Sequence, residues 1–262
     1  MHRSVDNFGG GQSDMTAVFG VDIGGSGIKG APVDLGRGVL TEERHKVLTP
    51  QPSAPEAVVA AVREVVRHFD HRGPVGLTFP GVVVNGQTRT AANVDKGWIG
   101  VDAAGLFREA LDLPAVVLND ADAAGLAETT HGAGRDQEGV VLVLTFGTGI
   151  GSALFVDGAL VPNTELGHLE VRGKDAERRA SSAAKERHGL NWEQWAGRVD
   201  EYLDVVEMLF SPQLIVIGGG VSRKHEKFLP LLRGREARVV PAELRNDAGI
   251  VGAAMAAARA SA

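Results

Sequence analysis

Two copies of one pattern constrain the fold of this chain most: an apolar strand, a glycine-rich turn and a second strand. The first copy spans Ala17–Asp34, and its turn consists of Gly24, Gly25, Ser26 and Gly27. β-Branched residues flank the turn, which predicts a strand on each side. Glycines allow positive φ and let phosphate oxygens approach backbone N–H groups. The alternative is a hairpin without a ligand, although a hairpin needs only two turn residues.

Two charged side chains belong to this first copy. Asp22 ends the first strand, where its carboxylate could hold a phosphate-bound Mg²⁺ through water, and Lys29 adds a cation. The stretch is not a P-loop, and it is not the dinucleotide fingerprint either, because a strand follows the turn where that fingerprint needs a helix.

The second copy begins with the apolar strand Val140–Thr145 and continues through Gly147, Thr148 and Gly149 into the strand Ser152–Val156. Gly24 aligns with Gly147, and Asp34 aligns with Asp157, under one shift of the sequence. Two lobes that start alike would each supply a phosphate-binding turn. Such a pair predicts a clamp around a phosphate chain.

Composition limits the possible functions. The chain has 262 residues, 44% of them apolar, which is enough for two lobes. A net charge of −6 argues against a nucleic-acid partner, and the absence of cysteine excludes disulfides and thiolate zinc sites. No apolar run approaches the length of a membrane span. Residues 1–16 are polar and glycine-rich, so we expect a disordered tail there. They lack the apolar core of a signal peptide, so we expect a cytoplasmic protein.

Periodicity predicts an α/β arrangement of the remaining elements. Strands are expected over 75–79, 115–118, 214–217 and 238–240, and residues 39–48 would add a third strand to the first hairpin. Helices are expected over 55–69, 101–111, 121–130, 190–210, 222–232 and 247–260.

Polar residues follow several of these strands. Asn119 and Asp120 lie at a strand's carboxyl end, where open α/β sheets place ligands. Asp120 either caps the following helix or accepts a proton from a hydroxyl as a general base. Asn93 lies in a polar loop with Trp98 and either caps a turn or bonds a sugar hydroxyl, while Trp98 is a candidate for the core.

Three further stretches allow two interpretations each. Glu165 and His168 form either a surface turn or a hydrogen-bonding pair, since no cysteine or second nearby histidine completes a zinc set. The glycines Gly218, Gly219 and Gly220 serve packing alone or admit a phosphate or flat ring against the backbone. The basic stretch 172–188 is either a solvated helix face with paired charges or part of an anion-binding rim.

Taken in order, these motifs resemble the ROK family of sugar kinases, and the resemblance extends over residues 17–260. It implies the two-lobed, actin-like or ribonuclease H-like ATPase fold, with a cleft between the lobes. The stretches GGSGIKGAPVD and TAANVDKGWIG are similar to those members that phosphorylate glucose with inorganic polyphosphate, and in many cases also with ATP.

The resemblance also implies roles for individual residues. Asp120 would be the catalytic base, Mg²⁺ the cofactor, and the protein a homodimer. The glucose contacts would be Asn93, Asn119, Glu165, His168 and, by a looser match, Glu177. The chain departs from most members in lacking their cysteine-rich zinc motif, which removes zinc and leaves His168 to be oriented by something else. Residues 1–16 do not resemble the DNA-binding segment of ROK repressors.

We expect a small lobe from residues 17–120 with 246–262, and a large lobe from 121–245. A polyphosphate donor would need a positive track beyond the two turns, for which the candidates are Lys29, Lys96, Arg172, Lys174, Arg178, Arg179, Arg223, Lys224 and Lys227. An ATP-only hexose kinase, a non-catalytic sugar sensor and an actin-like or chaperone ATPase remain alternatives.

Overall fold

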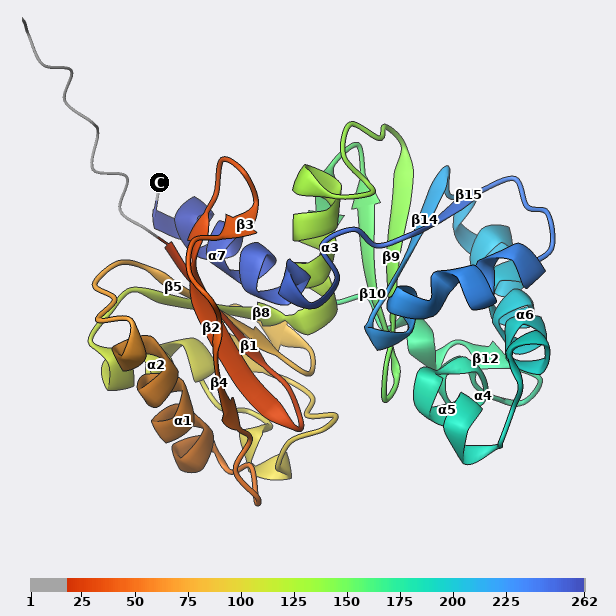
Figure 1. The fold of residues 1–262 in the computed structure, drawn as a ribbon. Helices are drawn as coiled ribbons and strands as arrows, with labels where there is room; N and C mark the ends of the chain where they lie inside the picture. Colours follow the sequence, from red (N-terminus) through yellow and green to blue (C-terminus); the bar gives the residue numbers. More distant parts are fainter. Residues whose placement is uncertain (1–17, 262) are drawn as a thin grey trace, which may run out of the picture.

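A computed structural model describes residues 18–261 (Figure 1). The tail expected over residues 1–16 lies outside the described residues. Within residues 18–261 two mixed sheets stand beside each other, each with helices on its flanks (Figure 1).

The first sheet begins with the first glycine turn. Its strand order is β3-β2-β1-β5-β8, and β4 also pairs with β2. β1 and β2 are antiparallel with Asp22 opposite Lys29, whereas β5 and β8 continue the sheet in parallel with β1. The strands are β1 (Val18–Ile23), β2 (Gly27–Asp34), β3 (Val39–Leu40), β4 (His45–Leu48), β5 (Val75–Phe79) and β8 (Ala115–Asn119).

The second sheet repeats this plan. Its order is β11-β10-β9-β14-β15, with an antiparallel hairpin of β9 and β10 and with β14 and β15 parallel to β9. The strands are β9 (Val140–Phe146), β10 (Ile150–Val156), β11 (Ala159–Val161), β14 (Leu214–Gly218) and β15 (Arg238–Pro241). The repeated strand–turn–strand pattern is therefore a repeated half-sheet.

Helices and short elements complete the two halves. The longer helices are α1 (Pro55–His68), α2 (Ala103–Leu111), α3 (Asp120–His131), α6 (Trp192–Phe210) and α7 (Ala248–Ser261). The short ones are α4 (Ala176–Ala180), α5 (Ser182–Arg187), η1 (Lys96–Trp98), η2 (Leu166–His168), η3 (Gly220–Lys227), η4 (Leu229–Leu231) and η5 (Arg245–Asp247). Two small hairpins pair β6 (Val83–Val84) with β7 (Gln87–Thr88), and β12 (Glu170–Val171) with β13 (Lys174–Asp175).

Two expected elements differ in the structure. The helix expected over 222–232 is wrong: the segment forms the separate 3₁₀ helices η3 and η4, with a kink at Lys224. Pro230 cannot donate a helical hydrogen bond, and it disfavours helical geometry at Leu229. The single strand expected over 39–48 is instead two short strands, both paired with β2.

Helices α3 and α7 lie between the two sheets (Figure 1). They approach so closely that a Cβ on Gly252 would overlap the carbonyl oxygen of Ala123. On its other side α7 lies on the first sheet, where a Cβ on Gly76 would overlap the carbonyl oxygen of Ala253. Only glycine permits these backbone contacts. The helix that starts at Asp120 is thereby held directly against α7.

Aromatic side chains fill the cores. Trp98 is fully buried near Phe79 and Phe107, with its ring N–H donating to the carbonyl of Ser53 at 3.0 Å, which confirms its place in the core. Trp195 and Tyr202 are equally buried in the second half. Of the helices that the structure describes, none has the length and apolar character needed to cross a membrane.

Candidate active site

A cavity of about 810 Å³ opens between the two halves and collects side chains from both. Most of the residues singled out from the sequence line it: Asp22, Gly24, Gly25, Lys29, Asn93, Lys96, Asn119, Asp120, Gly147, Thr148, Gly149, Glu165, His168, Glu177, Gly219 and Gly220. Segments far apart in the chain thus converge on one site.

Three expected phosphate-binding residues do not line the cavity. Ser26 is exposed at the tip of its turn, and Gly27 already belongs to β2, where a Cβ would press on Lys46. Gly218 is buried as the last residue of β14. In each turn only part of the glycine run faces the cavity, because the rest continues the strand pairing.

The first glycine turn carries an ordered charged pair. Lys29 Nζ lies 2.9 Å from Asp22 Oδ2, and Thr78 Oγ1 donates to Asp22 Oδ1 at 2.9 Å. The turn itself is closed by the N–H of Gly24, which donates to the carbonyl of Gly27 at 3.0 Å. Both carboxylate oxygens of Asp22 therefore have partners. A cation near this carboxylate fits best through bound water, the mode in which Mg²⁺ retains much of its hydration.

Asn119 and Asp120 have different roles at the start of α3. Asn119 is the N-cap: its Oδ1 accepts the N–H groups of Ala121 at 2.8 Å and Asp122 at 3.0 Å. Its Nδ2 donates to the carbonyl of Gly81 at 3.1 Å. The sequence allowed Asp120 as the cap, and that alternative is wrong. The Asp120 carboxylate accepts only the neighbouring Ala121 N–H, at 2.9 Å, and faces the cavity.

The position of Asp120 changes its acidity. Its side chain is open to the cavity water, but protein surrounds the cavity and reduces the solvation of a charge there. This desolvation, followed by repulsion from the Asp22 carboxylate, raises the pKa of Asp120 to about 7. A carboxylate with a pKa near neutrality is suited to accept a proton at the pH of a cell.

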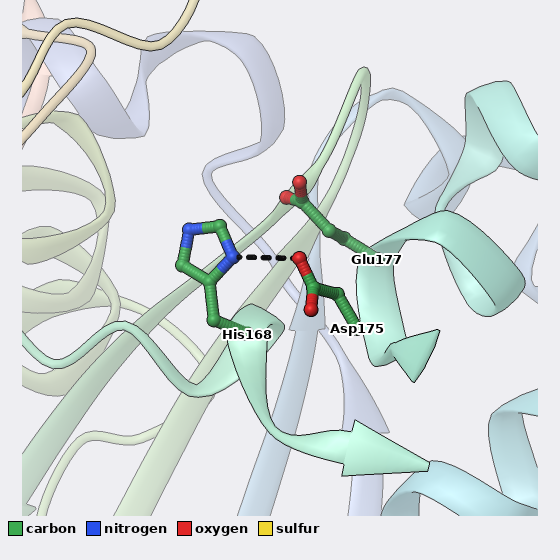
Figure 2. Close-up of side chains that lie close together, drawn as sticks. All are labelled: His168, Asp175 and Glu177. Carbon is green, nitrogen blue, oxygen red and sulfur yellow. Dashed lines mark hydrogen bonds and ion pairs between the residues drawn. The ribbon is translucent and has the colours of Figure 1, made fainter. Parts of the chain in front are cut away.

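His168 and Glu177 also line the cavity, and in Figure 2 their side chains and that of Asp175 point toward one another. His168 Nδ1 lies 3.4 Å from Asp175 Oδ2, and His168 Nε2 lies 3.7 Å from Glu165 Oε2. Glu177 accepts the backbone N–H of Ile150 at 3.4 Å. Sequence reasoning missed Asp175, since nothing in the sequence shows that the β12–β13 hairpin folds back on His168.

This group has the donor atoms of a cation site. In the part of the chain that the structure describes, only His168, Asp175 and Glu177 bring three candidate ligand atoms within 4.8 Å of one another. The set is one imidazole and two carboxylates, all at least partly open to solvent. The expectation that the protein has no zinc site stays a prediction.

Asn163 connects the two halves near the cavity. Its Oδ1 accepts the N–H of Val83, and its Nδ2 donates to the Val83 carbonyl, both at 2.8 Å. The backbone N–H of Asn163 donates to Asp122 Oδ2 at 2.8 Å. The loop that carries Glu165 is thus tied to β6 of the first half and to α3.

Most cations expected to form a positive track lie elsewhere. Arg172 pairs with Glu201 at 2.8 Å, Arg179 pairs with the same carboxylate, and Arg178 lies 3.7 Å from Asp175. Of the nine candidates only Lys29 and Lys96 line the cavity. The basic stretch is therefore closer to the solvated, paired interpretation. Two other cations, Arg89 and Arg245, line the cavity and were missed, because each stands alone in the sequence.

The duplicated half-sheets and the central cleft define the two-lobed, actin-like ATPase fold, to which sugar kinases belong. The sequence pattern of the ROK family matches residues 18–196. This chain belongs to the ROK family.

Relatives of known kind support the same grouping. The chain is 56% identical to the polyphosphate glucokinase of Mycobacterium tuberculosis (strain CDC 1551) over 239 residues, which cover 91% of this chain and 90% of that protein. Its structure is similar to that of an inorganic polyphosphate/ATP-glucomannokinase from Arthrobacter sp. strain KM, with a TM-score of 0.90 and 51% identity over 94% of this chain and 99% of the other. A ROK family glucokinase from Streptomyces griseus, in complex with glucose and AMPPNP, is 26% identical, with a TM-score of 0.79 over 93% of this chain and 99% of the other.

Proposed function

We propose that this protein transfers the terminal phosphoryl group of inorganic polyphosphate to the 6-hydroxyl of glucose, with Asp120 as general base, and that ATP is a second donor. The relatives named above support the reaction class and both donors. One observation carries the assignment of the base: Asn119 caps α3, which leaves the Asp120 carboxylate free to face the cavity between the two glycine turns.

In this proposal the residues that line the cavity have separate roles in binding glucose, accepting its proton and aligning the donor. Glucose lies against Asn93, Asn119, Glu165, His168 and Glu177, with its 6-hydroxyl at Asp120. Asp120 accepts the hydroxyl proton as the phosphoryl group arrives, and a positioned base of this kind contributes roughly 10² to 10⁴ in rate. The backbone of the turns at Gly24 and Gly147, together with Lys29, aligns the donor.

A divalent cation supplies positive charge to the donor phosphates in reactions of this class. We propose Mg²⁺, held at Asp22 through water, because both Asp22 oxygens are already engaged by Lys29 and Thr78. We also propose that the protein is a cytoplasmic homodimer, by its similarity to the family.

The first test is a coupled assay for glucose 6-phosphate with polyphosphate and ATP as separate donors, repeated with mannose in place of glucose. We expect product from polyphosphate at least as readily as from ATP. Product from ATP alone would remove the polyphosphate claim but keep the kinase. No product from either donor, with glucose still bound, would favour a sugar sensor.

The second test replaces the base. Asp120→Asn should lower kcat by about 10² or more while glucose binding, measured by calorimetry, persists. Asp122→Asn is the matched control: Asp122 lies on the same helix, does not line the cavity, and an asparagine can still accept the Asn163 N–H. Near-normal turnover of Asp120→Asn would contradict the assignment.

A further inference from the structure

Arg245 has an unusual backbone for its residue type. Nine non-glycine residues among 18–261 have positive φ, and six of them are Asp or Asn, which adopt this conformation most easily. Arg245, at φ 53°, is one of only two residues with long side chains in that set; the other is Arg172, also at φ 53°. Strained residues of this kind cluster at functional sites.

The surroundings of Arg245 differ from those of its cationic neighbours. Lys29 is paired with Asp22, and Arg44 is paired with Asp247. The Arg245 side chain, by contrast, forms no hydrogen bond or ion pair with any residue from 18 to 261, and Arg245 is an exposed residue that lines the cavity. An unpaired guanidinium on a residue at the cavity wall has its full set of donors available to an anion.

The position of Arg245 points to the donor end of the cavity. The carbonyl of the next residue, Asn246, accepts a hydrogen bond from Lys29 Nζ at 3.1 Å. A Cβ on Gly249, the second residue of α7, would lie 3.1 Å from Asp22 Cγ. η5, which carries Arg245, also contacts η3, the helix that begins at Gly220. Arg245 therefore lies beside both the first and the third glycine turns.

We propose that Arg245 binds the phosphate chain of the donor, through the planar, two-pronged contact that guanidinium groups make with phosphate oxygens. This rests on the proposed function. It makes Arg245 a contact to the donor and not to the sugar. The contact requires η5 to stay close to β2, the strand that follows the first turn. The hydrogen bond from Lys29 on β2 to the carbonyl of Asn246 on η5 holds the two together.

The left-handed backbone permits a clean variant. Arg245→Asn removes the guanidinium and leaves a residue that tolerates positive φ, so the fold should persist. Its matched control is Arg172→Asn, which makes the same residue change at the same φ, in the turn before Gly173 and outside the cavity. This control also removes the ion pair of Arg172 with Glu201, which keeps its pair with Arg179. Asn-Gly is a favoured pair in such hairpin turns.

We expect Arg245→Asn to raise KM for polyphosphate by about tenfold, as the loss of one charge-assisted contact implies, with KM for glucose nearly unchanged. Binding of inorganic tripolyphosphate, measured by calorimetry, should weaken by a similar factor. Arg245→Lys should fall between the two, since it keeps the charge and loses the fork. Arg172→Asn should match the unmodified protein.

Comparison of donors locates the contact. A parallel rise in KM for ATP places Arg245 at the phosphates that both donors share, and a rise for polyphosphate alone places it at phosphates further along the chain. Unchanged donor KM and tripolyphosphate affinity would overturn the inference, as would an equal loss in Arg172→Asn. If the unmodified protein neither uses polyphosphate nor binds tripolyphosphate, the proposed function fails, which is a distinguishable result.

Discussion

Asp120 is placed so that its protonation decides what it can do. It lies in the cavity with Asp22, where reduced solvation together with that neighbouring charge raises the pKa of Asp120 to about 7. The shift favours the protonated acid, whereas a general base must start as the carboxylate. The protein therefore operates close to the point where its base changes form.

A pH dependence follows for catalysis. The kcat/KM for glucose should rise with pH through about 7 and then level off, because only unprotonated Asp120 can accept the hydroxyl proton. The measurement is a pH profile at saturating donor, with buffers of constant ionic strength. A flat profile between pH 5.5 and 8.5, values chosen to span roughly one and a half units on each side of that pKa, would contradict the assignment.

The same shift has a consequence for stability with a definite sign. Because the pKa of Asp120 is higher in the folded than in the unfolded chain, its contribution to stability is present at low pH and is lost as pH rises from 3.8 toward 7. Asp120→Asn should therefore gain stability relative to the unmodified protein more at pH 8 than at pH 4. Water in the open cavity screens the charge and keeps this gain below what the shift alone implies.

At the scale of elements, the β12–β13 hairpin carries a side chain to the sugar-binding wall. Its turn consists of Arg172 and Gly173, both with positive φ, and it brings Asp175 to 3.4 Å from His168 Nδ1. Asp175 occupies the N-cap of α4 and makes no capping hydrogen bond there. Its carboxylate instead faces the imidazole (Figure 2). Such a partner fixes which ring nitrogen of His168 carries the proton.

We therefore expect Asp175→Asn to change the tautomer of His168, as read from the nitrogen chemical shifts of its ring in an NMR spectrum. KM for glucose should rise by about tenfold, the equivalent of about 1.4 kcal/mol, with a smaller effect on kcat. Arg178→Gln is the control, since Arg178 is the other ionic partner of Asp175. If Asp175→Asn leaves the His168 spectrum unchanged, as the control should, Asp175 does not orient the ring.

The elements that could be predicted from the sequence are those with a local cause. The hairpins around Gly24 and Gly147 follow from apolar strands and glycines that are adjacent in the chain. Arg245 and Asp175 were missed because their neighbours in the site come from distant segments. The capping role of Asn119 was also undetermined, because Asn and Asp are equally good N-caps and only the rotamers in the fold distinguish them.

At the scale of the whole molecule, α7 is the element that joins the two halves. It lies against the first sheet through Gly76 and against α3 through Gly252, and each contact has room for a hydrogen atom only. Because α3 begins at Asp120, the position of the proposed base depends on how closely the two helices approach. A change in the distance between α3 and α7 is transmitted to the cavity.

This dependence predicts the effect of one added methyl group. Gly252→Ala should lower the free energy of unfolding by about 1–3 kcal/mol, because the new Cβ overlaps the backbone of Ala123, and it should also lower kcat. Gly197→Ala, on α6, is the matched control. Apart from the backbone of α6 itself, a Cβ there meets nothing within 4 Å, so the free energy of unfolding should rise by about 0.5–1 kcal/mol. Urea denaturation of both variants checks the pair; equal stability for the two would contradict the packing argument.

The place of α7 also bears on how the protein is made. A ribosome delivers the strands of the first sheet early, the whole second sheet next, and residues 248–261 after both. All strands of the second sheet precede α7 in the chain, whereas β1 and β5 keep the face that α7 covers exposed until α7 has emerged. The half whose strands are synthesised first is therefore completed only after the strands of the other half, when α7 has emerged.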